Sequence, residues 1–459
     1  MKLSPAWFLN IVFLVVLAGV PLSQVAVEAC RGEWPQALAV FRQRPTAANL
    51  RAYERTLEEA SWTAAAFRPW VQDAQFTWLH DGGAKALVGR EGWLFYKPGV
   101  QYLTERPRTH EGIRTAREAL TAITAFRDQL AARGIPLIVM PVPNKESIYP
   151  DRLTQRAAQL RIAQCDETRG LLDGLKAAGV EVVDLFALFA EAKVSAPASS
   201  PPLYLAQDSH WSPAGLELAA RALAQRILAR GWARPGAVAY AGRPAPVERF
   251  GDLLLMLQVP QIERRAVPEH VPCVQVLRQD TGQLYRDDPH AEILVLGDSF
   301  LRIYETDEPQ SAGLIAHLAR ELQQPLTSLV NDGGASTLVR QELHRRPSVL
   351  AHKKLVIWEF AERDIRLGTE GWQHVPLPTT TDGTADRRPS AAWTNMAPDC
   401  SRRPRIGLVA IRRWSGGLRD FLQNRFAILP VSGYRNLKDD GKPTVVGGKF
   451  DQREPIAVP

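Results

Sequence analysis

Cysteine is scarce in this sequence, with four residues among 459, and the four lie far apart. They are Cys30, Cys165, Cys273 and Cys400, and no two form a Cys-x-x-Cys pair. This spacing excludes a zinc ribbon and a thioredoxin-like redox motif, and it leaves all three possible disulfide pairings open. The nine histidines are scattered singly without metal-ligand spacing, so we expect no bound metal.

Long hydrophobic runs are equally scarce, and the clear example stands at the amino terminus. Ala6 to Leu22 is an apolar run of 17 positions, broken only by Asn10 and Pro21. Its length is at the lower limit for crossing a bilayer, and Val27-Glu28-Ala29 is a mediocre cleavage site. Residues 1–29 are therefore expected to be a signal peptide or a retained membrane anchor. Either alternative places the rest of the chain in the periplasm.

The bulk composition does not favour disorder. With 45% hydrophobic and 23% charged residues, the chain is long enough for one large globular domain with additions. The formal net charge of +7 would suit a polyanionic partner. Because export argues against nucleic acid, an anionic polysaccharide is the natural alternative.

The central part of the chain alternates between helical and strand patterns. Apolar strand patterns occupy residues 135–142, 180–185, 293–296, 326–330 and 355–360, and helical patterns occupy residues 113–133, 152–178, 213–230, 311–322 and 337–346. Such alternation predicts a three-layer α/β/α domain with a mainly parallel sheet.

We assign residues 30–79 to a helical extension, in which Trp70, Phe76 and Trp78 are expected to pack, and residues 80–367 to the main domain. Residues 368–459 are assigned to a linker and an appendage of uncertain fold. Within the domain, the proline-rich stretch 233–288 is expected to be an irregular excursion rather than core.

Two motifs carry the chemistry. The segment Asp208-Ser209-His210-Trp211 supplies an acid and a base two positions apart, which point the same way if the segment is extended. About ninety residues later, the strand Ile293 to Leu296 ends at Gly297-Asp298-Ser299, which would place the Ser299 hydroxyl at the carboxyl edge of a sheet. Asp208, His210 and Ser299 are therefore the predicted catalytic triad. Asp298 is expected to be a turn or cap residue.

Five separated motifs, in matching order over residues 80–366, resemble the alginate O-acetyltransferase proteins of the AlgJ/AlgX type, which carry a domain of the SGNH hydrolase type. The motifs are Val88-Gly-Arg-Glu-Gly-Trp-Leu-Phe-Tyr96, Pro141-Val-Pro-Asn-Lys145 with Tyr149-Pro150, Asp208 to Trp211, Gly297-Asp-Ser-Phe-Leu-Arg-Ile-Tyr304, and Trp358-Glu-Phe-Ala-Glu-Arg363. In ordinary SGNH hydrolases the serine motif comes first. Here the Asp/His pair precedes it, as in the acetyltransferases, which argues against a common esterase.

Further site residues are predicted around the triad. Gly333, in the run Asn331-Asp-Gly-Gly334, is expected to donate a backbone N–H to the oxyanion. Contacts to the substrate are expected from Trp211, Lys145, Arg302 and Tyr304. Glu359 and Glu362 lie three apart without a partner motif, which argues against a glycosidase pair.

The resemblance implies an exported O-acetyltransferase that acetylates hydroxyls of an exopolysaccharide, alginate or a similar polymer, through an acetyl-enzyme intermediate and without a bound cofactor. The implied partner is an integral-membrane protein of the membrane-bound O-acyltransferase type, which hands over the acetyl group. Two alternatives stay open at this point. The same triad could remove acetyl groups as a carbohydrate esterase, or the fold could be a non-catalytic binding component of a secretion complex.

Overall fold

The computed structural model describes residues 5–42, 44–105, 111–197 and 199–377. Contacts divide the chain into two units, residues 1–382 and 383–459. The second unit and most of the predicted linker and appendage lie outside the described residues. Three cysteines, Cys30, Cys165 and Cys273, are described, and each is a free thiol.

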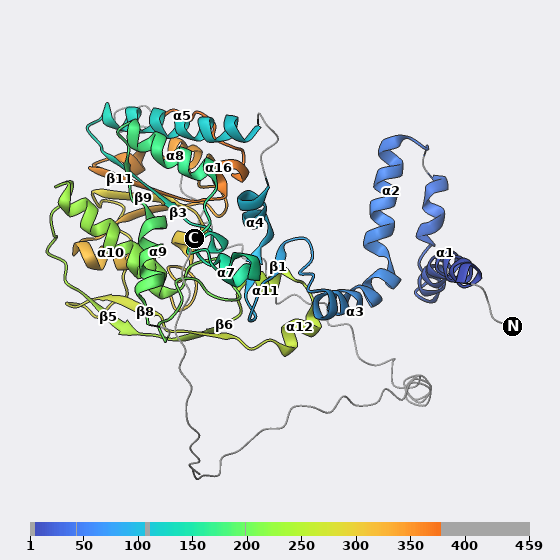
Figure 1. Cartoon of the computed structure of the whole chain (residues 1–459). Coiled ribbons are helices and arrows are strands. Elements are labelled where there is room, and N and C mark those ends of the chain that lie inside the picture. The colour runs from blue at the N-terminus through green and yellow to red at the C-terminus, as the bar shows by residue number, and fades with distance from the viewer. Residues whose placement is uncertain (1–4, 43, 106–110, 198, 378–459) are drawn as a thin grey trace, which may run out of the picture. The chain divides into compact units, whose positions relative to one another are not determined.

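A five-stranded sheet forms the centre of the domain (Figure 1). Its strands, in spatial order, are β10 (Thr327–Val330), β9 (Ile293–Gly297), β11 (Leu355–Ala361), β3 (Leu137–Val142) and β4 (Glu181–Val182). Every neighbouring pair is parallel, as the sequence predicts. The carboxyl ends of these strands therefore meet at one edge, where ligands bind in open α/β sheets.

Both faces of this sheet are covered by helices, which confirms the three-layer architecture. Residues alternate along each strand: Ile138 and Met140 of β3 belong to one apolar cluster, whereas Leu137 and Val139 belong to the other. The first cluster includes side chains of α9 (Leu185–Ser195), α10 (Pro213–Ala229) and α14 (Leu314–Leu322). The second includes side chains of α5 (Glu111–Ala131), α8 (Asp166–Ala177) and α15 (Leu338–Arg345). Trp372 and Leu377 also join the second cluster, so packed chain continues past the boundary predicted at residue 367.

Shorter elements complete the domain. They are the antiparallel hairpin β1 (Ala86–Val88) and β2 (Leu94–Tyr96), the helices α4 (Lys97–Thr104), α6 (Lys145–Ile148), α7 (Pro150–Leu153), α13 (Ser299–Arg302) and α16 (Asp364–Leu367), and the 3-10 turns Gln155–Ala157 and Pro347–Leu350. The helix predicted over residues 152–178 is wrong in its first half, since only α8 is a long helix there. Contacts from elsewhere hold the broken part: Ala163 N–H donates to Ser147 O at 2.8 Å, and Lys193 Nζ donates to Arg161 O at 3.3 Å.

The stretch 233–288 is more ordered than predicted. It contains β5 (Tyr240–Pro244) paired with β8 (Val274–Arg278), β6 (Val247–Arg249) paired with β7 (Glu269–Val271), and the helices α11 (Asp252–Met256) and α12 (Pro260–Arg265). Its side chains Val271, Cys273 and Tyr285 are buried in the first apolar cluster. The stretch is therefore part of the core, contrary to the prediction.

The amino-terminal part is helical, as predicted. It consists of α1 (Pro5–Cys30), a 3-10 helix (Gln36–Arg42), α2 (Ala47–Ala60) and α3 (Trp62–Leu79). Residues Trp7–Cys30 are long and apolar enough to cross a membrane, a test that a signal sequence also passes. The prediction that Trp70 and Trp78 pack is wrong, because their exposed fractions are 66% and 79%.

Candidate active site

Ser299 stands at the carboxyl edge of the sheet, where it is the first residue of α13 directly after the turn that follows β9. The turn begins at Gly297, where a side chain would collide with the Glu359 carboxylate, since a Cβ there would lie 2.3 Å from Oε2. Asp298 caps α13 by accepting the Phe300 N–H at 2.9 Å, in agreement with its predicted role as a cap. Ser299 is half-buried, whereas Gly297 and Asp298 before it are buried.

Asp208, His210 and Ser299 form one hydrogen-bonded row. His210 Nε2 lies 2.8 Å from Ser299 Oγ, and His210 Nδ1 lies 2.7 Å from Asp208 Oδ1. The His210 backbone N–H also donates to Asp208 Oδ1 at 3.0 Å, which fixes the carboxylate relative to the imidazole. The pair lies just before α10, whose start is capped by the Ser212 side chain as the sequence predicts. A nucleophile, a base and an orienting carboxylate in this geometry are suited to acyl transfer.

Two residues of the stretch 233–288 complete the surroundings of Asp208, and the sequence did not indicate either. Arg249 Nε lies 3.3 Å from Asp208 Oδ2, and the Asp252 backbone N–H donates to the same oxygen at 3.2 Å. Asp208 is fully buried, so these donors satisfy a carboxylate that would otherwise be costly to bury. Arg249 ends β6, a strand of three residues after Pro246, which is too short to give a recognisable pattern in the sequence.

Asp252 is a second carboxylate beside the histidine. Its Oδ2 lies 3.5 Å from His210 Nδ1, farther than Asp208, and it accepts the Ser209 hydroxyl at 2.5 Å. Asp208, His210 and Asp252 have ligand atoms within 4.8 Å of one another, a spacing that a metal ion could also use. However, Arg249 and Ser209 already engage the two carboxylates, and His210 Nε2 faces Ser299. The arrangement therefore favours a Ser-His-Asp catalytic triad, with Asp208 as its acid, over a metal site.

The pKa values of Asp208 and His210 are shifted by burial and by the charges next to each side chain. Burial alone would lower the pKa of His210, but the hydrogen bond and the negative charge of Asp208 outweigh it and raise that pKa above its ordinary value of about 6.5. Burial alone would raise the pKa of Asp208, but His210 and Arg249 hold it well below its usual range. Asp208 is therefore ionised, and it stabilises the imidazolium that forms when His210 takes a proton.

Lys145 was predicted to contact the substrate, but the structure places its side chain in the interior. Its side chain is buried, and Nζ donates to three backbone carbonyls: Leu94 O at 2.5 Å, Ala206 O at 2.8 Å and Asp208 O at 2.9 Å. Burial lowers its pKa to about 8. The ammonium group thus holds the loop that carries Asp208 and His210.

Replacing Lys145 with methionine is expected to reduce both stability and activity. The substitution leaves three buried carbonyls without a donor, which should lower the free energy of unfolding by on the order of 3 kcal/mol. Lys353→Met is the matched control, because Lys353 is a buried lysine whose Nζ donates to Pro289 O and Ala291 O, away from the triad. Urea unfolding should show a lower free energy of unfolding for both variants, whereas the rate of ester cleavage should fall only for Lys145→Met. Equal activity in the two variants would contradict the positioning role.

Trp211 and Tyr304 are also buried, so the predicted contacts to a sugar are excluded for both side chains. The Trp211 ring packs edge-on against Phe300, with centroids 5.2 Å apart, and Phe300 in turn lies 4.9 Å from the His210 ring. The Tyr304 hydroxyl donates to Trp211 O at 3.4 Å. Trp211, Phe300 and Tyr304 thus pack in the first apolar cluster, and they support the position of His210 from the interior of the domain.

Arg302 ends α13, and Gly333 lies on the loop after β10 at the same edge of the sheet. Arg302 is about one-third exposed, and its Nε donates to Asp332 Oδ1 at 3.0 Å, next to Gly333. Gly333 has a φ of +66°, a conformation that glycine adopts without strain. Arg302, Asn331 and Asp332 help to line a hollow of about 550 Å³ beside α13. This volume is in the range of ligand pockets, so Arg302 stays a candidate for substrate contact and Gly333 stays a predicted oxyanion donor.

Glu359 and Glu362 are fully buried and have structural partners. Glu359 Oε2 accepts the Asp298 N–H at 3.0 Å, which ties the turn before Ser299 to β11. Glu362 accepts the Asn144 N–H at 2.9 Å and the Thr168 hydroxyl at 2.8 Å, and burial raises its pKa to about 7. This placement agrees with the argument against a glycosidase pair.

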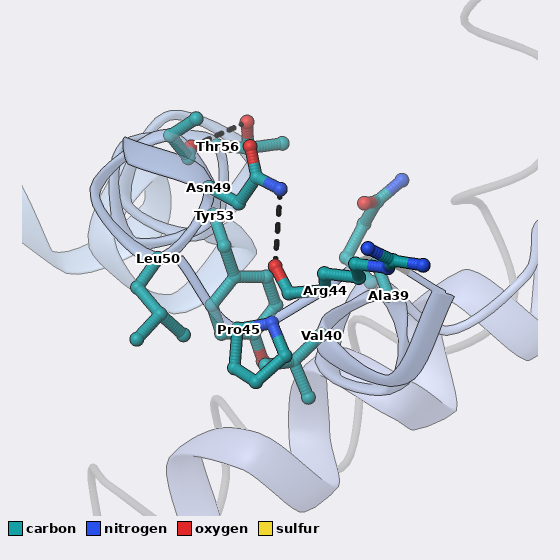
Figure 2. Close-up of a pocket in the computed structure, with 10 residues that line it drawn as sticks. Ala39, Val40, Arg44, Pro45, Asn49, Leu50, Tyr53 and Thr56 are labelled. Carbon is teal, nitrogen blue, oxygen red and sulfur yellow. Dashed lines mark hydrogen bonds between the residues drawn. The ribbon is translucent and has the colours of Figure 1, made fainter. Parts of the chain in front are cut away.

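A second hollow lies in the amino-terminal part, between the 3-10 helix Gln36–Arg42 and α2 (Figure 2). Asn49 Nδ2 donates to Arg44 O across it at 3.0 Å. Its volume of about 160 Å³ is below the usual range of ligand pockets, and no residue that lines it is an acid, a histidine or a cysteine.

A comparison with protein families decides the assignment. Residues 86–362 match the family described as "SGNH hydrolase-like domain, acetyltransferase AlgX". The chain belongs to this family. The match includes all three triad residues, both small antiparallel sheets of the stretch 233–288 and the whole five-stranded sheet.

Individual members of this acetyltransferase family are distant in sequence. The chain is 25% identical over 305 residues to the probable alginate O-acetylase AlgJ of Pseudomonas putida, a match that covers 63% of this chain and 72% of that protein. It is 23% identical over 321 residues to the probable alginate O-acetylase AlgJ of Pseudomonas aeruginosa, covering 64% and 74%. The solved O-acetyltransferase domain of Pseudomonas putida AlgJ superposes with a TM-score of 0.50 at 22% identity, covering 62% of this chain and 93% of that domain. The superposition supports the fold.

Proposed function

We propose that this acetyltransferase moves acetyl groups onto hydroxyls of an exopolysaccharide through the triad Asp208, His210 and Ser299. The observation that carries the proposal is the hydrogen-bonded row at the sheet edge, with His210 Nε2 at 2.8 Å from Ser299 Oγ and Nδ1 at 2.7 Å from Asp208 Oδ1. Membership of an acetyltransferase family supplies the reaction class.

The reaction has two acyl-transfer steps. Ser299 Oγ attacks the acetyl carbonyl of the donor while His210 Nε2 takes the hydroxyl proton, and the leaving group departs with that proton. A sugar hydroxyl then attacks the acetyl ester on Ser299 as His210 takes its proton. The ester bond to the enzyme breaks, and the proton returns to Ser299 Oγ. Asp208 stays ionised throughout and holds the imidazole in place.

The acceptor and the donor follow from the family and from the amino-terminal helix. The two AlgJ relatives carry alginate O-acetylase in their names, and the net charge of +7 is suited to a uronic-acid polymer, so alginate or a similar polymer is the proposed acceptor. The apolar helix α1 supports export to the periplasm as a signal or an anchor. The proposed donor is an integral-membrane protein of the membrane-bound O-acyltransferase type that delivers acetyl groups from the cytoplasm.

A transfer assay tests this proposal. The purified chain is incubated with an activated acetyl ester and either uronic-acid oligomers or neutral oligomers of equal length, and acetylated sugars are counted by mass spectrometry. We expect acetylation of the uronic-acid oligomers to exceed that of the neutral ones. Release of acetate at a rate that no oligosaccharide changes would instead identify a carbohydrate esterase.

The pH dependence of ester cleavage should report His210. Because the base must be neutral to accept the Ser299 proton, kcat/KM should rise with pH through the pKa of His210. Since Asp208 raises that pKa above about 6.5, the midpoint should lie above this value. In Asp208→Asn the midpoint should move down, because the stabilising charge is lost. A midpoint below the ordinary histidine value in the unmodified protein would contradict the pairing.

A further inference from the structure

Helix α3 presents an exposed apolar stripe. Phe67, Trp70, Val71 and Trp78 are each more than half exposed, and their spacing of three, one and seven residues places them on one helix face. All residues of α3 are described, and none of its side chains is fully buried. A helix face with three aromatic rings is normally covered, so an exposed stripe indicates an interaction surface.

The other side of α3 already has a partner. Phe76 packs against the apolar cluster formed by Leu253 and Ile262 with their neighbours, and Asp73 forms an ion pair with Arg265. The stripe therefore faces away from the contacts that α3 makes with the catalytic domain. Its occupant has to come from outside the described residues.

The start of α3 is joined to the end of α1. Ser23 Oγ lies 3.0 Å from Thr63 Oγ1, the Trp62 N–H donates to Gln24 Oε1 at 2.7 Å, and Gln24 Nε2 donates to Ala60 O at 3.0 Å. The preceding part of α1, from Trp7 to Leu17, exposes apolar side chains all around the helix. With 26 residues, α1 is roughly 39 Å long, enough to cross a hydrocarbon core of about 30 Å and to emerge at its polar end.

We propose that α1 stays in the membrane and that the stripe Phe67, Trp70, Val71 and Trp78 lies in the interfacial layer of the lipid bilayer beside it. Tryptophan is enriched at this depth because its ring is apolar and its N–H needs a polar partner. The hydrogen bonds to Ser23 and Gln24 hold the start of α3 where α1 leaves the hydrocarbon. The contact would keep the catalytic domain close to the bilayer surface, and it does not depend on the proposed acetyl transfer.

Photo-cross-linking of the full chain in vesicles tests the proposal. The protein is reconstituted in phosphatidylcholine vesicles that contain a lipid with a photoactivatable acyl chain, and adducts are mapped by mass spectrometry. We expect adducts on α1 and on the stripe, and none on Phe250 and Val267, which are exposed apolar residues of the catalytic domain. In the double variant Trp70→Ser/Trp78→Ser, the adducts on α3 should be lost while those on α1 remain. The far-UV circular dichroism spectrum serves as the folding control for the variant.

Three results would overturn the proposal. Adducts confined to α1 would show that the stripe is not in contact with lipid. Adducts on Phe250 or Val267 equal to those on the stripe would show non-specific labelling. A membrane-free chain from cells, with an amino terminus beyond Cys30, would show that α1 is removed as a signal.

Discussion

Ser299→Ala is expected to abolish both acetyl transfer and ester cleavage, with a loss of turnover on the order of 10⁶ by analogy with other serine nucleophiles. The hydroxyl is the atom that His210 Nε2 faces at 2.8 Å, and the histidine has no other nucleophile to activate in the row Asp208, His210 and Ser299. Because Ser299 is half-buried at the start of α13, its loss leaves no large cavity, so the thermal unfolding midpoint should change little. Steady-state kinetics with an activated acetyl ester measure the effect.

Ser336→Ala is the matched control for this variant. Ser336 is fully buried near the same sheet edge, and its hydroxyl donates to Thr369 O at 3.2 Å rather than to a histidine. We expect a modest loss of stability and nearly full activity. If Ser299→Ala retained ester cleavage at a rate similar to that of Ser336→Ala, the assignment of the nucleophile would be wrong.

Asp208→Asn is expected to lower turnover by a factor on the order of 10⁴, with little change in substrate binding. The amide cannot accept the Nδ1–H of His210 with the strength of a carboxylate, and it can favour the wrong tautomer. The change also removes the ion pair with Arg249 at 3.3 Å, so some loss of stability should accompany it. Separate measurement of kcat and KM distinguishes the two effects.

Two other carboxylates provide controls for this result. Asp298→Asn retains an oxygen that can cap the Phe300 N–H, and Asp252→Asn retains the backbone N–H that donates to Asp208. Both substitutions should lower turnover much less than Asp208→Asn does. A crippling effect of Asp298→Asn together with a harmless Asp208→Asn would show that the acid had been assigned to the wrong residue.

The sheet and the triad geometry could be predicted because their signals are local. A buried strand ending at Gly297-Asp298-Ser299 fixes the serine at the sheet edge. The spacing of two residues lets Asp208 reach His210, although through a bend in which Asp208 Oδ1 accepts the His210 N–H rather than through an extended segment. Alternation of strands and helices then brings the strand ends to one edge, as the parallel pairings of β9, β10 and β11 confirm.

The roles of the residues around the triad could not be predicted because they depend on contacts between segments that are distant in the sequence. Lys145 looks like a free surface charge in the sequence, yet its Nζ is buried among carbonyls of β2 and of the loop that carries Asp208. Trp211 follows a catalytic histidine and suggests a sugar platform, but its ring packs on Phe300, 89 residues away in the chain. Arg249 and Asp252 come from a proline-rich stretch without a regular apolar period, so no local pattern could indicate that they surround Asp208.

Trapping of the acetyl-enzyme tests the central claim most directly. The protein is mixed with an activated acetyl ester in the absence of sugar, quenched in acid within the first turnover, and digested for peptide mapping by mass spectrometry. The proposed mechanism predicts a single acetyl group on Ser299, lost on addition of uronic-acid oligomers with the appearance of acetylated sugar. Transfer to sugar with no acetyl group on Ser299, or with the acetyl group on another residue, would contradict it.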